Sequence, residues 1–144
     1  MNDNDRALCA ATAGLLRASS AAAAWGLALS CIAGLVLALT GRSLPTAAWF
    51  TTAAVALIGL VERYLALRLR LEATLFEGLA TNGIASLETL DTALAQLALR
   101  GRAAEPRTLV ERAAGARQMT QRHGLAVALQ TAVFAMALAV QDWR

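Results

Sequence analysis

Three long stretches without a charged side chain constrain the fold of this chain more than any other feature of its sequence. They run through residues 18–41, 43–61 and 124–141. A helix needs about 20 predominantly apolar residues to cross the roughly 30 Å hydrocarbon core of a bilayer. The pattern therefore predicts an all-α integral membrane protein with three transmembrane helices, at residues 20–40, 45–67 and 123–143.

Composition argues against the main alternative, a soluble domain of the same length. Hydrophobic residues make up 58% of the 144 positions, and charged residues make up only 16%. A globule of this size needs more polar surface than that to stay in water. The only cysteines, Cys9 and Cys31, are too few for a disulfide scaffold, and we expect them to lie too far apart to pair.

The second charge-free stretch is short for a span, and the residues that follow it indicate how it is anchored. Residues 46–61 number only sixteen. We therefore expect this helix to run to residue 67, with Glu62 and Arg63 reaching the lipid headgroups beside Tyr64. Trp49 and Trp143 mark the opposite interface, because amphipathic rings prefer to lie there.

The distribution of arginine predicts the orientation of the three spans. The stretch from Glu62 to Arg122 contains nine arginines, Arg122 included, whereas the loop at residues 41–44 carries only Arg42. Loops rich in positive charge stay in the cytoplasm. We therefore expect residues 68–122 to form a cytoplasmic insertion and residues 1–19 to be a cytoplasmic or interfacial segment. The C-terminus is then periplasmic or extracellular.

The insertion is rich in helix-forming residues, which predicts a cytoplasmic helical hairpin extending from spans two and three. The second span is expected to continue to Ala80, followed by a turn at Asn82-Gly83 and a helix N-cap at Ser86. The next helix is expected to end at Arg100-Gly101. Pro106 then opens the last helix, which runs into the third span.

Leucines recur with helical spacing inside the insertion and form a first candidate contact surface, the leucine stripe. Its members are Leu87, Leu90, Leu94 and Leu97. This spacing puts all four side chains on one helix face. The stripe either packs against the extensions of spans two and three or docks a partner helix, and the sequence leaves both interpretations open.

Small residues at every fourth position of the first span form a second candidate surface, the small-residue stripe. Its members are Gly26, Ser30, Gly34 and Ala38. Such a groove lets another helix approach closely in lipid, where no hydrophobic force drives association. An alanine-rich chain produces this pattern by chance, but two glycines and a serine in register exceed that background. The sequence does not decide whether the groove faces the chain's own spans or another subunit.

Catalytic and metal-binding motifs are not found in the sequence. The single histidine, His123, falls at the start of the third span and is expected to be structural. Gln130 is the only strongly polar side chain deep inside a predicted span, and no ionisable residue is expected at mid-membrane. This disfavours a carrier or channel that depends on titratable groups. We expect neither enzymatic activity nor a cofactor.

The types of basic residue and their distribution indicate the source of the protein and the partners it is expected to have. All 13 basic residues are arginine, which together with the abundant alanine indicates a GC-rich bacterial source. The arginines are interleaved with acidic residues, so a nucleic-acid partner is not expected. The sequence favours a small structural or accessory subunit of the bacterial inner (plasma) membrane, assembling with other membrane subunits in a homo- or hetero-oligomer. The alternative is a holin-like or transport-related oligomer that permeabilises the membrane.

Overall fold

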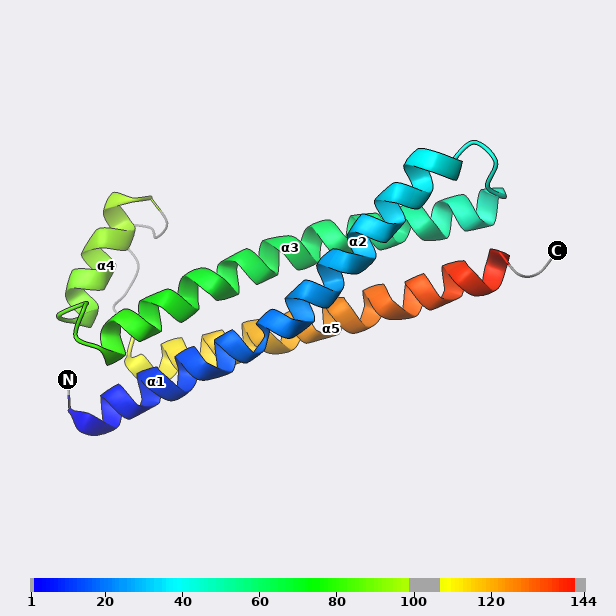
Figure 1. The fold of residues 1–144 in the computed structure, drawn as a ribbon. Helices are drawn as coiled ribbons and strands as arrows, with labels where there is room; N and C mark the ends of the chain where they lie inside the picture. The colour runs from blue at the N-terminus through cyan, green and yellow to red at the C-terminus, as the bar shows by residue number, and fades with distance from the viewer. Residues whose placement is uncertain (1, 99–106, 142–144) are drawn as a thin grey trace. The chain divides into compact units, whose positions relative to one another are not determined.

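The computed structural model describes residues 2–98 and 107–141, and within these ranges it contains helices and their connections but no strand (Figure 1). The helices are α1 (Asp3–Ala18), α2 (Ser20–Thr40), α3 (Thr46–Ala80), α4 (Leu87–Gln96) and α5 (Leu109–Gln141). Three helical stretches are long and apolar enough to cross a membrane, namely Asp3–Thr40, Thr46–Ala80 and Leu109–Val140. The all-α fold and the three candidate spans predicted from the sequence are confirmed, and they fit a multi-pass membrane protein.

Side-chain caps explain where two of the helices begin. Ser86 accepts a hydrogen bond at 3.1 Å from the backbone N–H of Thr89, which confirms the predicted N-cap of α4. At the start of α5, the backbone N–H of Thr108 donates to Glu111 Oε2 at 2.8 Å, and the N–H of Glu111 donates to Thr108 Oγ1 at 3.3 Å. This reciprocal pair is a capping box. The hydrogen bond from the Thr108 backbone lowers the pKa of the Glu111 carboxyl.

Left-handed backbone conformations mark where α3 and α4 end. Helix α3 ends at Ala80, and Asn82 follows with a φ of 59° at the predicted Asn82-Gly83 turn. Helix α4 ends at Gln96, and Ala98 follows with a φ of 55°. The predicted helix end at Arg100-Gly101 and the predicted start at Pro106 lie outside the described residues.

The chain divides into two compact units, each of which contains part of α3 and part of α5. The first unit comprises Met1–Ala18 and Leu69–Met119, and the second comprises Ser19–Arg68 and Thr120–Arg144. Residues 20–40 of the first predicted span lie in α2, residues 46–67 of the second lie in α3, and residues 123–141 of the third lie in α5. The two units are described separately below.

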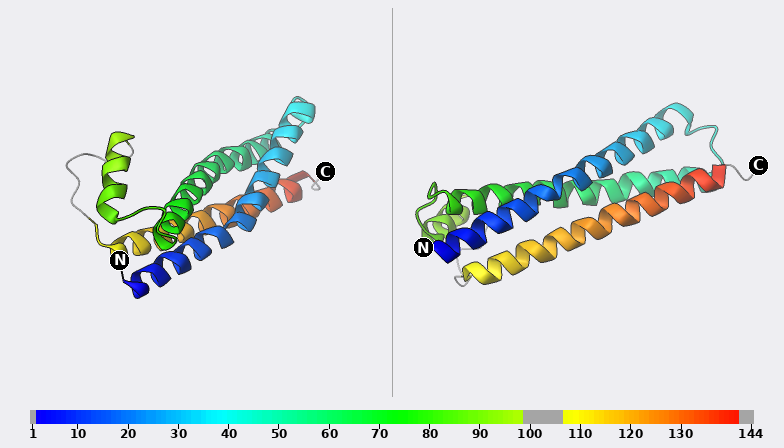
Figure 2. Two further views of the ribbon diagram at one scale, coloured as in Figure 1. Left: turned by 60° about the vertical axis from the view of Figure 1, so that its left-hand side comes forward. Right: turned by 60° about the horizontal axis from the view of Figure 1, so that its bottom comes forward.

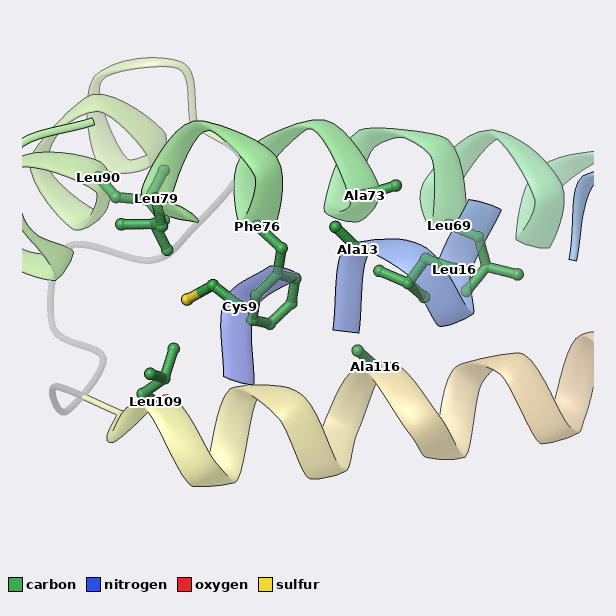
Figure 3. Close-up of a cluster of buried hydrophobic side chains, with 10 residues drawn as sticks. All are labelled: Cys9, Ala13, Leu16, Leu69, Ala73, Phe76, Leu79, Leu90, Leu109 and Ala116. Carbon is green, nitrogen blue, oxygen red and sulfur yellow. The ribbon is translucent and has the colours of Figure 1, made fainter. Parts of the chain in front are cut away.

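The first unit is built around a hydrophobic core to which α1, α3, α4 and α5 all contribute (Figure 3). The buried members are Cys9, Ala13, Leu16, Leu69, Ala73, Phe76, Leu79, Leu90, Leu109 and Ala116. Leu90 of the leucine stripe belongs to this core, and Leu87 and Leu94 pack partly buried against it. Leu97 is different, because it lies just beyond the end of α4 and is 68% exposed. Most of the stripe is therefore internal packing.

The second unit brings α2, the N-terminal part of α3 and the C-terminal part of α5 side by side (Figure 2). Its buried apolar core is formed by Leu29, Ala33 and Val55. Large aliphatic side chains such as Leu39 and Leu125 lie exposed on its surface. Exposed aliphatic side chains are suited to lipid, whereas the buried interior also holds several polar groups.

Candidate functional site

The most unusual feature of the second unit is a buried acid paired with a buried histidine. Glu62 lies on α3 and His123 lies on α5, and their exposed fractions are 0% and 1%. His123 Nε2 is 2.8 Å from Glu62 Oε1. A carboxylate only accepts hydrogen bonds, so the imidazole donates from Nε2 when Glu62 is ionised. The pair thus joins α3 to α5 by a hydrogen bond that water does not reach.

Arg63 supplies the charge that balances the buried carboxylate. Its Nε is 2.8 Å from Glu62 Oε2, and its Nη2 is 2.9 Å from Glu62 Oε1. Nη2 also donates to the backbone carbonyl oxygen of Ala23 on α2. The carboxylate and the guanidinium carry opposite unit charges, so the cluster has zero net charge when the imidazole is neutral. The pairing is favourable because an isolated buried charge is costly. The cluster therefore contacts all three helices of the second unit.

A glycine makes room for the carboxylate on the third helix. A Cβ atom placed on Gly26 would lie 2.8 Å from Glu62 Cδ and 3.0 Å from Glu62 Oε2. Real Cβ atoms are essentially never found closer than 3.0 Å to such neighbours. Gly26 was predicted to form a groove for a helix, and in the structure its missing side chain accommodates a side chain of the same chain.

A second polar layer surrounds Gln130, seven residues beyond His123 on α5. Gln130 is 0% exposed, and its Nε2 is 2.9 Å from Ser30 Oγ, 3.2 Å from the Gly26 carbonyl oxygen and 3.4 Å from that of Val55. Ser30 in turn donates to the Gly26 carbonyl at 2.9 Å. Among the described residues, Gln130 Oε1 is buried without a hydrogen-bond partner. At about 1.5 Å per residue, this layer lies roughly 10 Å along α5 from His123.

Gly59 is the residue that lets these polar side chains fit between the helices. A Cβ atom on Gly59 would overlap Ser30 Oγ and would lie 2.9 Å from Gln130 Nε2. We expect Gly59→Leu to destabilise the second unit by about 2 kcal/mol or more, because overpacking displaces buried side chains. Gly124→Leu is the matched control, since a Cβ there would meet nothing within 4 Å. The measurement is the unfolding midpoint in a mixed-detergent titration, and equal midpoints for the two variants would contradict the packing described for Gly59.

The small-residue stripe divides into two halves in the structure. Gly26 and Ser30 take part in the packing of the second unit, whereas Gly34 and Ala38 are exposed. A Cβ atom on Gly34 would meet nothing within 4 Å. The half of the stripe nearer the end of α2 is therefore not covered by the described part of the chain.

The predicted interface anchors also have different environments. Trp49 and Tyr64 are exposed, as residues at a lipid interface would be, and Trp143 lies outside the described residues. Arg63 is partly exposed, with 28% of its side chain accessible, whereas Glu62 is completely buried. The anchoring role of these residues stays a prediction, but the carboxylate of Glu62 is directed to the interior and not to the surface.

The contact between Glu62 and His123 was not predicted from the sequence, which indicates an interface position for Glu62 and a structural role for His123. They are 61 residues apart, and no spacing rule links two positions on different helices at that distance. A local signal was available only for the glycines, since Gly59 and Glu62 are three residues apart and share a helix face. That signal marks a face on which a large polar group needs room, but it does not identify the partner.

The chemistry of the cluster is that of a carboxylate, an imidazole and a guanidinium in contact. Among residues 2–98 and 107–141, no group of three or more His, Cys, Asp or Glu side chains is placed to hold a metal ion. Imidazole is the side chain whose protonation ordinarily changes near neutral pH.

Comparisons with protein-family models, with curated proteins and with solved structures show no match to this chain.

Proposed function

We propose that this protein is a structural or accessory subunit that mediates assembly of a membrane protein complex and has no enzymatic activity. The observation that supports this proposal is the uncovered half of the small-residue stripe at Gly34 and Ala38. Small residues on a lipid-exposed helix face allow another transmembrane helix to approach closely, with gains in dispersion contacts. The partner is therefore a transmembrane helix of another membrane subunit, from a second copy or from a different protein.

Gly34→Leu tests the proposal without disturbing the fold of the chain itself. The new side chain meets no atom of the second unit, and it makes the span more hydrophobic. We therefore expect normal insertion but a shift of the complex to a smaller species on native gels, with about tenfold weaker association or more. The physical reason is that a leucine keeps the partner backbone away over about two helical turns.

Ala28→Leu is the matched control for this experiment. Ala28 is also exposed on α2, but it lies about 120° around the helix from Gly34. It introduces the same side chain on a different side, and we expect it to leave the complex intact. If Gly34→Leu assembles like the wild-type protein, the proposed assembly surface is wrong. Leakage of a dye from cells or vesicles on expression, with no change on native gels, would instead favour a permeabilising oligomer.

The proposed setting is the bacterial inner membrane, with the N-terminus in the cytoplasm and the C-terminus on the periplasmic side. The support is the nine arginines from Arg63 to Arg122, eight of which lie between the second and third spans, against one between the first and second. We expect a cysteine introduced at position 95 to be labelled only from the cytoplasmic side, and one at position 144 only from the periplasmic side. Labelling of both from one side of the membrane would contradict the three-span orientation.

A further inference from the structure

One exposed face of α3 changes from apolar to polar along its length within the second unit. Its exposed side chains recur at intervals of four, three and four residues and belong to Leu57, Val61, Tyr64 and Arg68. This spacing puts them on one side of the helix. The face, named here the Tyr64/Arg68 face, thus presents two aliphatic side chains, then a phenol, and then a guanidinium.

The length of α3 brings the polar end of this face to a membrane surface. Trp49, near the start of α3, is exposed and is of the type that gathers at the interface. Arg68 follows it by nineteen residues, a rise of about 28 Å, which is close to the roughly 30 Å of the hydrocarbon core. Leu57 and Val61 therefore lie against acyl chains, and the long side chain of Arg68 extends among the headgroups.

The charge of Arg68 is not neutralised by the described part of the chain. Four other arginines each pair with a carboxylate, namely Arg6, Arg17, Arg63 and Arg112. No acidic side chain among residues 2–98 and 107–141 forms such a pair with Arg68, including Glu72 four residues further along α3. A guanidinium has five N–H donors and a phenol has one O–H donor. The donors of Arg68 and Tyr64 are therefore available to a ligand outside the chain.

We propose that the Tyr64/Arg68 face binds an anionic phospholipid. The phosphate oxygens of the headgroup accept hydrogen bonds from the guanidinium of Arg68 and the hydroxyl of Tyr64, whose Cβ atoms lie about 6 Å apart as neighbours on a helix surface. The acyl chains of the same lipid lie along Leu57 and Val61. This inference is independent of the proposed assembly role, which concerns α2.

The two ends of the face select the class of ligand together. A zwitterionic phospholipid carries a cation beside its phosphate, so it gains less from the charge of Arg68 than an anionic lipid does. Free inorganic phosphate has the negative charge but no apolar part to cover Leu57 and Val61. An anionic phospholipid satisfies both ends of the face at once.

The experiment measures lipid binding to the full chain by native mass spectrometry in a mild neutral detergent. Dissociation constants are determined for phosphatidylglycerol, which has a single net negative charge, and for zwitterionic phosphatidylcholine. We expect the wild-type protein to bind phosphatidylglycerol about fivefold more tightly or more, as one arginine at an anionic lipid surface contributes. Equal dissociation constants for the two lipids would overturn the proposal without recourse to any variant.

Arg68→Gln and Arg122→Gln separate a site on α3 from a general attraction between arginines and anionic lipid. Both arginines are exposed, belong to the second unit and directly flank a predicted span, so neither substitution is expected to disturb the fold. We expect Arg68→Gln to lose most of the preference for phosphatidylglycerol and Arg122→Gln to keep it. Equal losses in the two variants, or a preference retained in Arg68→Gln, would overturn the proposed site.

Tyr64→Phe and inorganic phosphate complete the test. Removal of the hydroxyl alone should weaken the binding of phosphatidylglycerol about threefold, because one hydrogen bond is lost while the ring stays. An unchanged dissociation constant would overturn the assignment of the headgroup to this face. Radiolabelled inorganic phosphate at millimolar concentration should show no saturable binding in equilibrium dialysis. Saturable phosphate binding that Arg68→Gln abolishes would show that the face takes free phosphate and not a lipid.

Discussion

Replacing Leu90 with aspartate is expected to destabilise the first unit by about 3 to 5 kcal/mol. Leu90 is 5% exposed and packs in the core that α1, α3, α4 and α5 share. The substitution removes apolar contacts and places a carboxylate where no partner is arranged for it. We expect loss of intact protein in cells and a lower unfolding midpoint, with membrane insertion unchanged because α4 is not a candidate span.

Leu97→Asp is the control for this substitution and lies just beyond the end of the same helix. Leu97 follows the last residue of α4 and is 68% exposed, so an aspartate there remains in contact with solvent. Its effect should stay within about 0.5 kcal/mol, which is usual for surface positions. If both substitutions lower the unfolding midpoint to a similar extent, the segment docks onto something outside the chain. If neither substitution lowers the midpoint, Leu90 is not a core residue.

Arg63→Met should have the second large effect, a loss of about 3 kcal/mol or more in the stability of the second unit at neutral pH. The substitution keeps a long apolar side chain but leaves the completely buried carboxylate of Glu62 without its balancing charge. It also leaves the Ala23 carbonyl without the guanidinium. Breaking one side of a buried ion pair costs far more than losing a surface pair.

Arg68→Met separates this loss from a general effect of removing arginine. Arg68 lies five residues further along α3 and is exposed. We expect its replacement to change the unfolding midpoint in detergent only slightly. If the two arginine variants unfold at the same detergent composition, Arg63 does not balance the charge of Glu62.

The parts of the fold that depend on short-range patterns could be predicted from the sequence. Charge-free length indicates a span, and a serine before a leucine-rich run indicates an N-cap, so α2 and the start of α4 follow directly from local rules. Helix α1 was not predicted as a helix, although Asn2 and Asp5 form a reciprocal cap there and Cys9, Ala13 and Leu16 recur on one face. Its buried face is short and is formed mostly by small residues, with Leu16 buried and Leu8 partly buried, which makes the periodicity weak.

The candidate site could not be predicted in the same way, because it depends on which helix faces meet. Glu62 next to Arg63 in the sequence resembles an interfacial pair, and nothing local shows that its carboxylate turns inward. The decisive partner is His123 on another helix, and the decisive space is provided by Gly26 on a third. Gly26 also illustrates why the small-residue stripe was ambiguous, since the same missing side chain serves helix approach or side-chain clearance.

The separation of Glu62 and His123 along the chain has a consequence for biogenesis. Ribosomes add about 5 to 20 residues per second, so the 61 residues between them correspond to a delay of about 3 to 12 s. Ala23 and Glu62 have been synthesised when this delay begins, and Arg63 is the next residue added. Helices α2 and α3 are joined by a connection of only a few residues. The nascent acid therefore has its guanidinium counter-ion from the moment α3 is made, whereas its imidazole arrives with α5, as the final step in assembling the second unit.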